Sequence, residues 1–180
     1  GDVYKRQVVA NCHKVPQSNF TKELLDLNEL TEIYLKIFKK LISNNPKLRI
    51  VLTVSPVRHH KDGIVENNQS KSILLLLCKA LSDDFKHNVV YFPSYEIQMD
   101  DLRDYRFYSS DLVHPNQMAI NYIFEKFSTA FFTKQTSLLN SKIEKLNKLE
   151  NHRFLNTSTE ERQKHQDKIL ELKRDVNQGG

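Results

Sequence analysis

Three short apolar segments, rich in β-branched or aromatic residues, occur at Val8–Asn11, Arg49–Val54 and Asn88–Phe92. The second is almost continuously apolar, which is typical of a strand covered on both faces. Pro93 follows the third and ends it, because proline cannot donate a hydrogen bond within a sheet. The pattern therefore predicts three strands.

Between and after these segments, apolar residues recur at helical spacing, which predicts helices over Thr21–Ser43, Asn68–Leu81 and Asn116–Phe132. Strands that alternate with helices are typical of a parallel α/β sheet with covering helices. Ligands bind such sheets at the carboxyl ends of strands, which here are residues 11–13 and 55–60.

The chain changes character after Lys134, where leucine and isoleucine recur at three- and four-residue steps among Lys, Asn and Glu. Ser158 and Glu161 have the spacing of a capping box, which predicts the start of a second helix that runs to about Val176. The heptad pattern persists for fewer repeats than a coiled coil requires. We therefore expect a helical hairpin that packs on the domain, on a protein partner or on a second copy of the chain.

The amino-terminal seven residues, Gly1–Gln7, resemble translated adapter sequence and are set aside from fold reasoning. We expect a domain over residues 8–133 and a helical tail over 134–180. Residues 8–11 resemble the end of an interior strand, so the chain is interpreted as an amino-terminally truncated fragment. The presence of a signal peptide upstream therefore stays open.

Composition narrows the class of protein only modestly. The net charge of +5 is spread over the body and the tail rather than gathered on one face, which argues against nucleic-acid binding. No apolar run approaches the roughly 20 residues that cross a bilayer. Two cysteines, Cys12 and Cys78, make no disulfide framework and weakly favour a reducing, cytoplasmic location.

The first candidate for chemistry is Asp111, three residues before His114, on a loop that enters a helix. A histidine titrates near neutral pH and suits a general base for a serine hydroxyl. A carboxylate can hold its second ring nitrogen and stabilise the imidazolium. The alternative is a helix-capping aspartate beside an exposed histidine.

A second candidate follows the first predicted strand. Asn11 could donate to an oxyanion from the strand end, or could simply close a turn. Cys12 and His13 suggest a cysteine nucleophile, but adjacent residues of an extended segment point to opposite sides. Packing of Cys12 in the core is the alternative.

A third candidate segment, residues 53–63, places Ser55 at a strand end near two histidines. Pro56 follows the serine and cannot donate a backbone hydrogen bond to an oxyanion, so Ser55 is a poor nucleophile. Arg58 could hold a carboxylate or an anionic substrate. His59 and His60 lack partners at zinc-ligand spacing, so no metal is expected, and no cofactor motif is recognised.

Charged and aromatic residues alternate densely over residues 95–108. We expect arginine–carboxylate pairs and buried tyrosines to shape the loop that presents Asp111 and His114. Direct substrate contact from Arg103 or Arg106 is the alternative. The three aspartates of this segment lack the spacing of a calcium loop.

Eight ordered motifs together resemble the GSCFA domain family, a bacterial branch of the SGNH/GDSL-type hydrolases. The resemblance covers roughly residues 8–132. The motifs are residues 9–16, 53–59, 62–63, 66–67, 70–71, 91–96, 101–108 and 111–115.

The resemblance implies a flavodoxin-like three-layer α/β/α fold, here incomplete at its amino end, and a serine esterase reaction on a small acyl ester. It assigns Asp111 and His114 to the catalytic triad and Asn11 to the oxyanion site. The Gly-Ser-Cys-Phe-Ala segment that carries the family's nucleophile does not occur in this chain, nor does the block with an oxyanion glycine.

Two hypotheses follow. In the first, the chain is the carboxyl-terminal part of a GSCFA-type serine hydrolase, inactive without the upstream serine. In the second, it is a non-catalytic α/β binding module that binds a partner through its helical tail. A metal-dependent hydrolase is a distant third.

Overall fold

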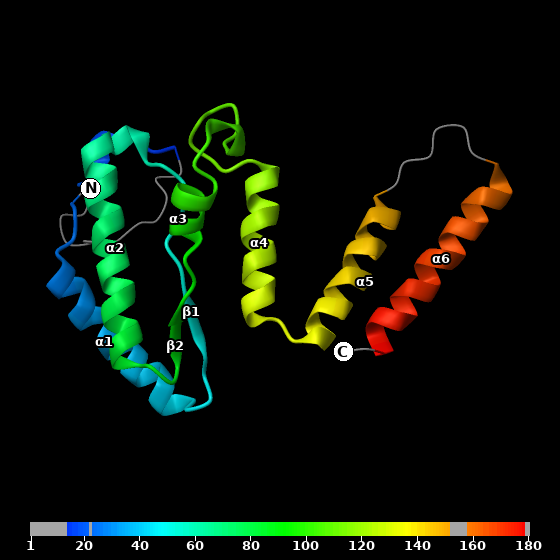
Figure 1. The fold of residues 1–180 in the computed structure, drawn as a ribbon, viewed down its shortest axis with the longest axis horizontal. Coiled ribbons are helices and arrows are strands. Elements are labelled where there is room, and N and C mark those ends of the chain that lie inside the picture. The colour runs from blue at the N-terminus through cyan, green and yellow to red at the C-terminus, as the bar shows by residue number, and fades with distance from the viewer. Residues whose placement is uncertain (1–13, 22, 152–157, 179–180) are drawn as a thin grey trace. The chain divides into compact units, whose positions relative to one another are not determined.

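A computed structural model describes residues 14–21, 23–151 and 158–178. The chain forms two compact units, Gly1–Pro93 and Ser94–Gly180. Figure 1 labels the helices and strands of both units.

The first unit has α/β character. Its elements are η1 (Gln17–Asn19), α1 (Leu27–Asn44), β1 (Ile50–Leu52), η2 (His60–Asp62), α2 (Ile64–Asp84) and β2 (Val89–Tyr91). Among the described residues the sheet has two strands, β1 and β2, which are parallel with Val51 opposite Val90. These strands confirm the two predicted over Arg49–Val54 and Asn88–Phe92, although each is shorter than predicted. The predicted strand Val8–Asn11 lies outside the described residues.

The predicted start of the first helix at Thr21 is wrong, because α1 begins six residues later, behind an N-cap at Asp26. The Asp26 carboxylate accepts hydrogen bonds from the backbone N–H groups of Asn28 (2.8 Å) and Glu29 (3.3 Å). These contacts satisfy donors that the first turn of a helix leaves without partners. The polar cap, not the apolar spacing, therefore determines where the helix starts.

Helix α2 begins four residues before the predicted Asn68 and continues three residues past Leu81. Gly63 precedes it with a φ of 98°, a conformation that side chains rarely adopt. A Cβ atom at this position would collide with the Glu66 carboxylate. The left-handed glycine thus makes the sharp entry into α2 that apolar spacing alone does not locate.

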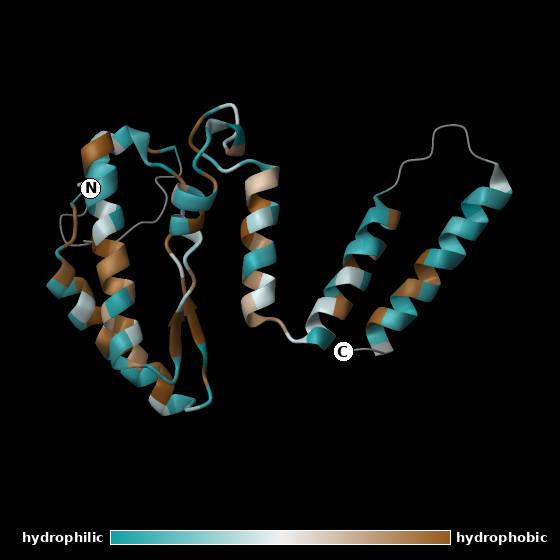
Figure 2. Ribbon diagram, in the orientation of Figure 1, coloured by the Kyte–Doolittle hydropathy of each residue, from teal (hydrophilic) through white to brown (hydrophobic). Residues whose placement is uncertain are grey.

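Both helices and both strands of the first unit share one core. Its buried residues are Phe38 from α1, Leu77 and Leu81 from α2, and Val89 from β2. Partly buried residues of the same elements complete it, including Ile50 and Leu52 of β1. Figure 2 shows the strands and parts of α1 and α2 in the brown of apolar residues. The core confirms helices on one face of the strands. The cover on both faces that was expected for residues 49–54 stays a prediction, because Val51 is 38% exposed.

The second unit contains no strand among its described residues. Its elements are α3 (Ser94–Glu96), the π-helical turn η3 (Ile97–Asp101), η4 (Tyr105–Phe107), α4 (Gln117–Phe131), α5 (Lys134–Glu150) and α6 (Thr159–Gln178). Helix α4 confirms the helix predicted over Asn116–Phe132, with Asn116 as its N-cap. None of the described helices of the chain is long and apolar enough to cross a membrane.

Helices α5 and α6 pack against each other as the predicted hairpin (Figure 1). The capping box is present, since Ser158 Oγ accepts from Glu161 N (3.3 Å) and Glu161 Oε2 accepts from Ser158 N (3.1 Å). The ring nitrogen Nε2 of His165 donates to the Leu149 carbonyl across the pair (2.8 Å). No described residue of either helix is fully buried, so the contact is a shallow seam.

We predict that the core of the first unit is sensitive to truncation at Leu81, whose exposed fraction is 1%. Leu81→Ala leaves a cavity that costs about 2–5 kcal/mol of the free energy of unfolding. The matched control is Leu76→Ala on the same helix, where the side chain is 53% exposed and the expected cost is below about 0.5 kcal/mol. Urea unfolding followed by circular dichroism measures both, and equal costs would contradict the assigned core.

Candidate active site

The candidate site is a loop that a short backbone stem closes on itself. Tyr108 and Pro115 form an isolated antiparallel bridge. On either side of it, Ser109 N donates to the His114 carbonyl (2.8 Å) and Asn116 N donates to the Phe107 carbonyl (2.9 Å). The stem brings the ends of residues 108–115 together, so the loop has a defined backbone despite containing no regular structure.

Asp111 lies in this loop with its carboxylate over the backbone of the two residues beyond Leu112. One oxygen, Oδ1, accepts from Val113 N (2.9 Å) and from His114 N (3.1 Å). The other, Oδ2, lies 2.7 Å from His114 Nδ1. Leu112 adopts a left-handed φ of 57° between them. This conformation costs a non-glycine residue about 1–2 kcal/mol, and here it lets the chain turn under the carboxylate.

The contact between Asp111 and His114 determines the tautomer of the imidazole. An ionised carboxylate only accepts, so Nδ1 must carry the proton that joins the two groups. In the neutral ring, Nε2 then keeps its lone pair and can take a proton. The geometry is that of a carboxylate that orients a general base.

The hydrogen bonds hold the pKa of Asp111 well below its ordinary value, at about 2. The main cause is the backbone N–H of His114, followed by the backbone N–H of Val113 and then the imidazole. The charged form is therefore stabilised by the loop itself. The side chains of His114 and Asp111 are 60% and 48% exposed, so the pair is open to solvent.

Asn116 connects the loop stem to α4. Its amide nitrogen Nδ2 donates to the carbonyls of Arg106 (2.6 Å) and Tyr108 (3.4 Å). Its amide oxygen accepts from Ala119 N (3.1 Å) in the first turn of α4. One side chain therefore joins the segment before the loop to the helix after it.

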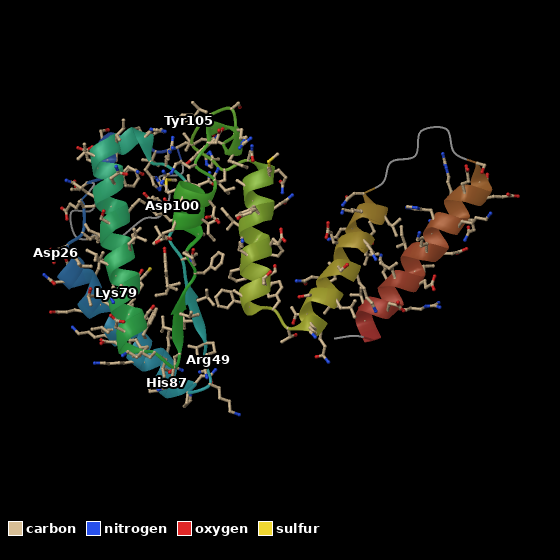
Figure 3. All side chains as sticks on the ribbon, in the orientation of Figure 1. Asp26, Arg49, Lys79, His87, Asp100 and Tyr105 are labelled. Atoms are coloured by element: carbon tan, nitrogen blue, oxygen red, sulfur yellow. The ribbon has the colours of Figure 1, made fainter. Side chains whose placement is uncertain are left out.

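The two arginines predicted before the loop have local carboxylate partners. Arg103 pairs with Asp100 at 3.1 Å, and Arg106 approaches Asp104 at 3.9 Å while its guanidinium lies over the ring of Phe107. The expected arginine–carboxylate pairs are thus present. Asp100 and Tyr105, both labelled in Figure 3, mark the two turns of this segment.

Helix α4 is also tied to this segment. The Tyr122 hydroxyl donates to Asp101 Oδ2 (3.0 Å), at the end of the π-helical turn. Together with Asn116, this contact fixes α4 against the turns that lead into the loop.

The other predicted residues belong to the first unit or lie outside the described part of the chain. Ser55 Oγ accepts from Val57 N (3.2 Å), and the Ser55 carbonyl accepts from the buried Lys71 amine. Burial lowers the pKa of Lys71. Arg58 is half-buried on the same segment after β1. Asn11, with Cys12 and His13, lies outside the described residues.

The part of the chain that the structure describes contains no candidate metal site. There, no three His, Cys, Asp or Glu side chains gather in a way that could hold an ion. The backbone of His59 donates to the Asn67 side chain (2.9 Å), which places the His59–His60 pair at the entry to α2.

Sequence reasoning missed the residues that build the loop, above all Leu112 and Asn116. The left-handed Leu112 carries no sequence signal, because glycine, asparagine or aspartate would be expected there. Asn116 did carry one, since an asparagine before an apolar-periodic segment is a common N-cap. That signal predicts the contact with Ala119 but not the contacts with Arg106 and Tyr108.

The chain thus combines a region of α/β character with an imidazole that a carboxylate orients on a structured loop. It belongs to the GSCFA family, whose model matches residues 2–127. No curated protein and no solved structure matches the chain. The family match includes the Asp111–His114 loop and most of α4 and ends before α5.

We predict that the Asp111 carboxyl titrates near pH 2 rather than at its ordinary value near 3.9. The folded pKa is lowered, so the stabilisation is complete above the ordinary pKa and is lost as the pH falls towards 2. Carbon-detected NMR of the carboxyl group measures the midpoint.

In His114→Ala the midpoint should rise only in part, because the two backbone donors remain. A midpoint at the ordinary value in the unmodified chain would contradict the hydrogen bonding described here.

Proposed function

We propose that the chain is the carboxyl-terminal part of a GSCFA-type SGNH serine hydrolase, whose intact parent hydrolyses a small acyl ester. The observation that carries this proposal is the 2.7 Å contact between Asp111 Oδ2 and His114 Nδ1 in a loop that also holds the carboxylate by two backbone donors. Membership of the family supports it independently.

In the proposed reaction, His114 Nε2 takes the proton of a serine hydroxyl while the serine oxygen attacks the ester carbonyl. Asp111 stays ionised and stabilises the imidazolium that forms. The imidazolium then gives its proton to the departing alcohol, which leaves an acyl-serine. Water, deprotonated by the same nitrogen, cleaves the acyl-serine to the carboxylic acid and regenerates the enzyme.

The serine itself is proposed to come from the family's Gly-Ser-Cys-Phe-Ala segment, upstream of Val8 in the parent. Ser55 is unsuited to the role, because its hydroxyl accepts from Val57 N and Pro56 follows it. The chain alone should therefore be inactive. Asn11 is proposed as an oxyanion donor, and Arg58, Arg103 and Arg106 as substrate contacts.

A three-layer α/β/α sandwich is the fold we propose for the parent domain. One face of the β1–β2 sheet packs on the helices, whereas Val51 and Val90 on the opposite face are 38% and 44% exposed. Parallel sheets are almost always covered on both faces. These exposed valines support a second helical layer over that face.

The rival is a non-catalytic module that binds a protein partner, or a second copy of itself, through α5 and α6. It is favoured by the shallow seam of the hairpin, by its position beyond the family match, and by the exposed Leu138 (63%) and Leu170 (53%). The two hypotheses make opposite predictions about a reactive serine.

We predict that the parent, extended upstream through the Gly-Ser-Cys-Phe-Ala segment, hydrolyses p-nitrophenyl acetate. His114→Ala should then lower kcat by roughly 10²–10⁴-fold, because the general base is lost. The control is His87→Ala, a histidine of the first unit (Figure 3), which should leave kcat unchanged.

Fluorophosphonate labelling followed by peptide mapping tests the nucleophile. A labelled serine upstream of Val8 excludes the binding module. Undiminished turnover in His114→Ala would remove His114 from the mechanism, and an unlabelled, inactive parent would favour the rival.

A further inference from the structure

The contact between Asp111 and His114 depends on the loop backbone that carries both residues. Both side chains are about half exposed or more. Exposed ion pairs contribute little to stability because water screens them, so such a pair alone does not fix a ring in one orientation. The backbone on either side of His114 must therefore be held by other groups.

Asn116 is placed to supply that support. It stands two residues after His114, and Pro115 between them restricts the intervening backbone. Its Nδ2 lies between the carbonyls of Arg106 and Tyr108, at 2.6 and 3.4 Å, on the opposite side of the stem. Its own backbone N–H donates to Phe107, so three consecutive carbonyls of one segment are held by one residue.

The oxygen and the nitrogen of the Asn116 side-chain amide have different roles. The oxygen accepts from Ala119 N and caps α4, a task that aspartate or serine also performs. The nitrogen donates to the stem, a task that neither can perform, because a carboxylate has no donor and a serine side chain is too short to bridge both ends. Clamping of the stem is therefore separable from capping of the helix.

We propose that Asn116 is a positioning residue, whose amide clamp on residues 106–108 holds the loop stem and thereby keeps His114 aligned with Asp111. The consequence for catalysis rests on the proposed hydrolase function. The consequence for the geometry of the pair does not, and this separates the two tests.

The first test uses Asn116→Asp in the full chain. Aspartate keeps the cap on Ala119 but turns a carboxylate oxygen towards two carbonyls, which repels the stem. NMR of chain labelled with ¹⁵N-histidine should show loss of the single Nδ1-protonated form of His114. The Asp111 midpoint should rise from about 2 towards its ordinary value.

Asn116→Ser is the second variant, in case the aspartate variant fails to fold. It also keeps a capping oxygen, and its side chain is too short to bridge the stem, so the amide contacts are lost without added charge. The matched control is Thr133→Ala, which removes the N-cap contact of α5 to Thr136 N (3.1 Å) and leaves the loop intact. Circular dichroism confirms that helix content is retained.

The second test measures kinetics in the upstream-extended parent. Asn116→Asp and Asn116→Ser should lower kcat for p-nitrophenyl acetate by roughly 10- to 100-fold, the cost of a misplaced catalytic group, with little change in KM. Thr133→Ala should leave both constants unchanged.

The outcomes separate the two claims. A folded Asn116 variant with unchanged His114 and Asp111 signals, or with unchanged kcat in an active parent, overturns the positioning role. An inactive parent whose Asn116 variants still disturb those signals overturns the hydrolase while confirming the clamp.

Discussion

The geometry of the candidate site depends on the backbone stem that pairs Tyr108 with Pro115. Proline has no N–H, so the stem uses the groups on either side of it, from Ser109 to the His114 carbonyl and from Asn116 to Phe107. With the ends held, the loop can turn tightly enough to bring two backbone donors under the Asp111 carboxylate. The left-handed Leu112 is the strained point in that turn, and the hydrogen bonds to Asp111 offset its cost.

The backbone hydrogen bonds of the loop also account for the ionised state of Asp111. Because the backbone donors, rather than the imidazole, are the larger cause of the low pKa of Asp111, the carboxylate is ionised whatever the charge of His114. An orienting group that is ionised at neutral pH is what a general base requires. Its electrostatic effect is weak in water and strong in a dry site. Both side chains are exposed, so the effect of the charge on the imidazole is screened by water in the structure described here.

Much of the fold followed from apolar spacing, and the exceptions have physical reasons. Helical spacing located α4 almost to the residue, and short runs of apolar residues identified β1 and β2. It placed the starts of α1 and α2 wrongly, since those depend on the polar cap at Asp26 and the left-handed Gly63. The π-helical turn Ile97–Asp101 has no spacing signature and was not predicted.

The candidate site, too, could be predicted only in part from the sequence. Asp111 and His114 could be predicted, because residue chemistry and three-residue spacing are local properties of the sequence. The stem could not, because the contacts of Asn116 reach back eight and ten residues to backbone carbonyls on the other side of the loop. A side chain that acts on backbone carbonyls leaves no pairing pattern in the sequence. Motif recognition therefore finds the ionisable pair of such a loop and overlooks the residue whose contacts hold the stem.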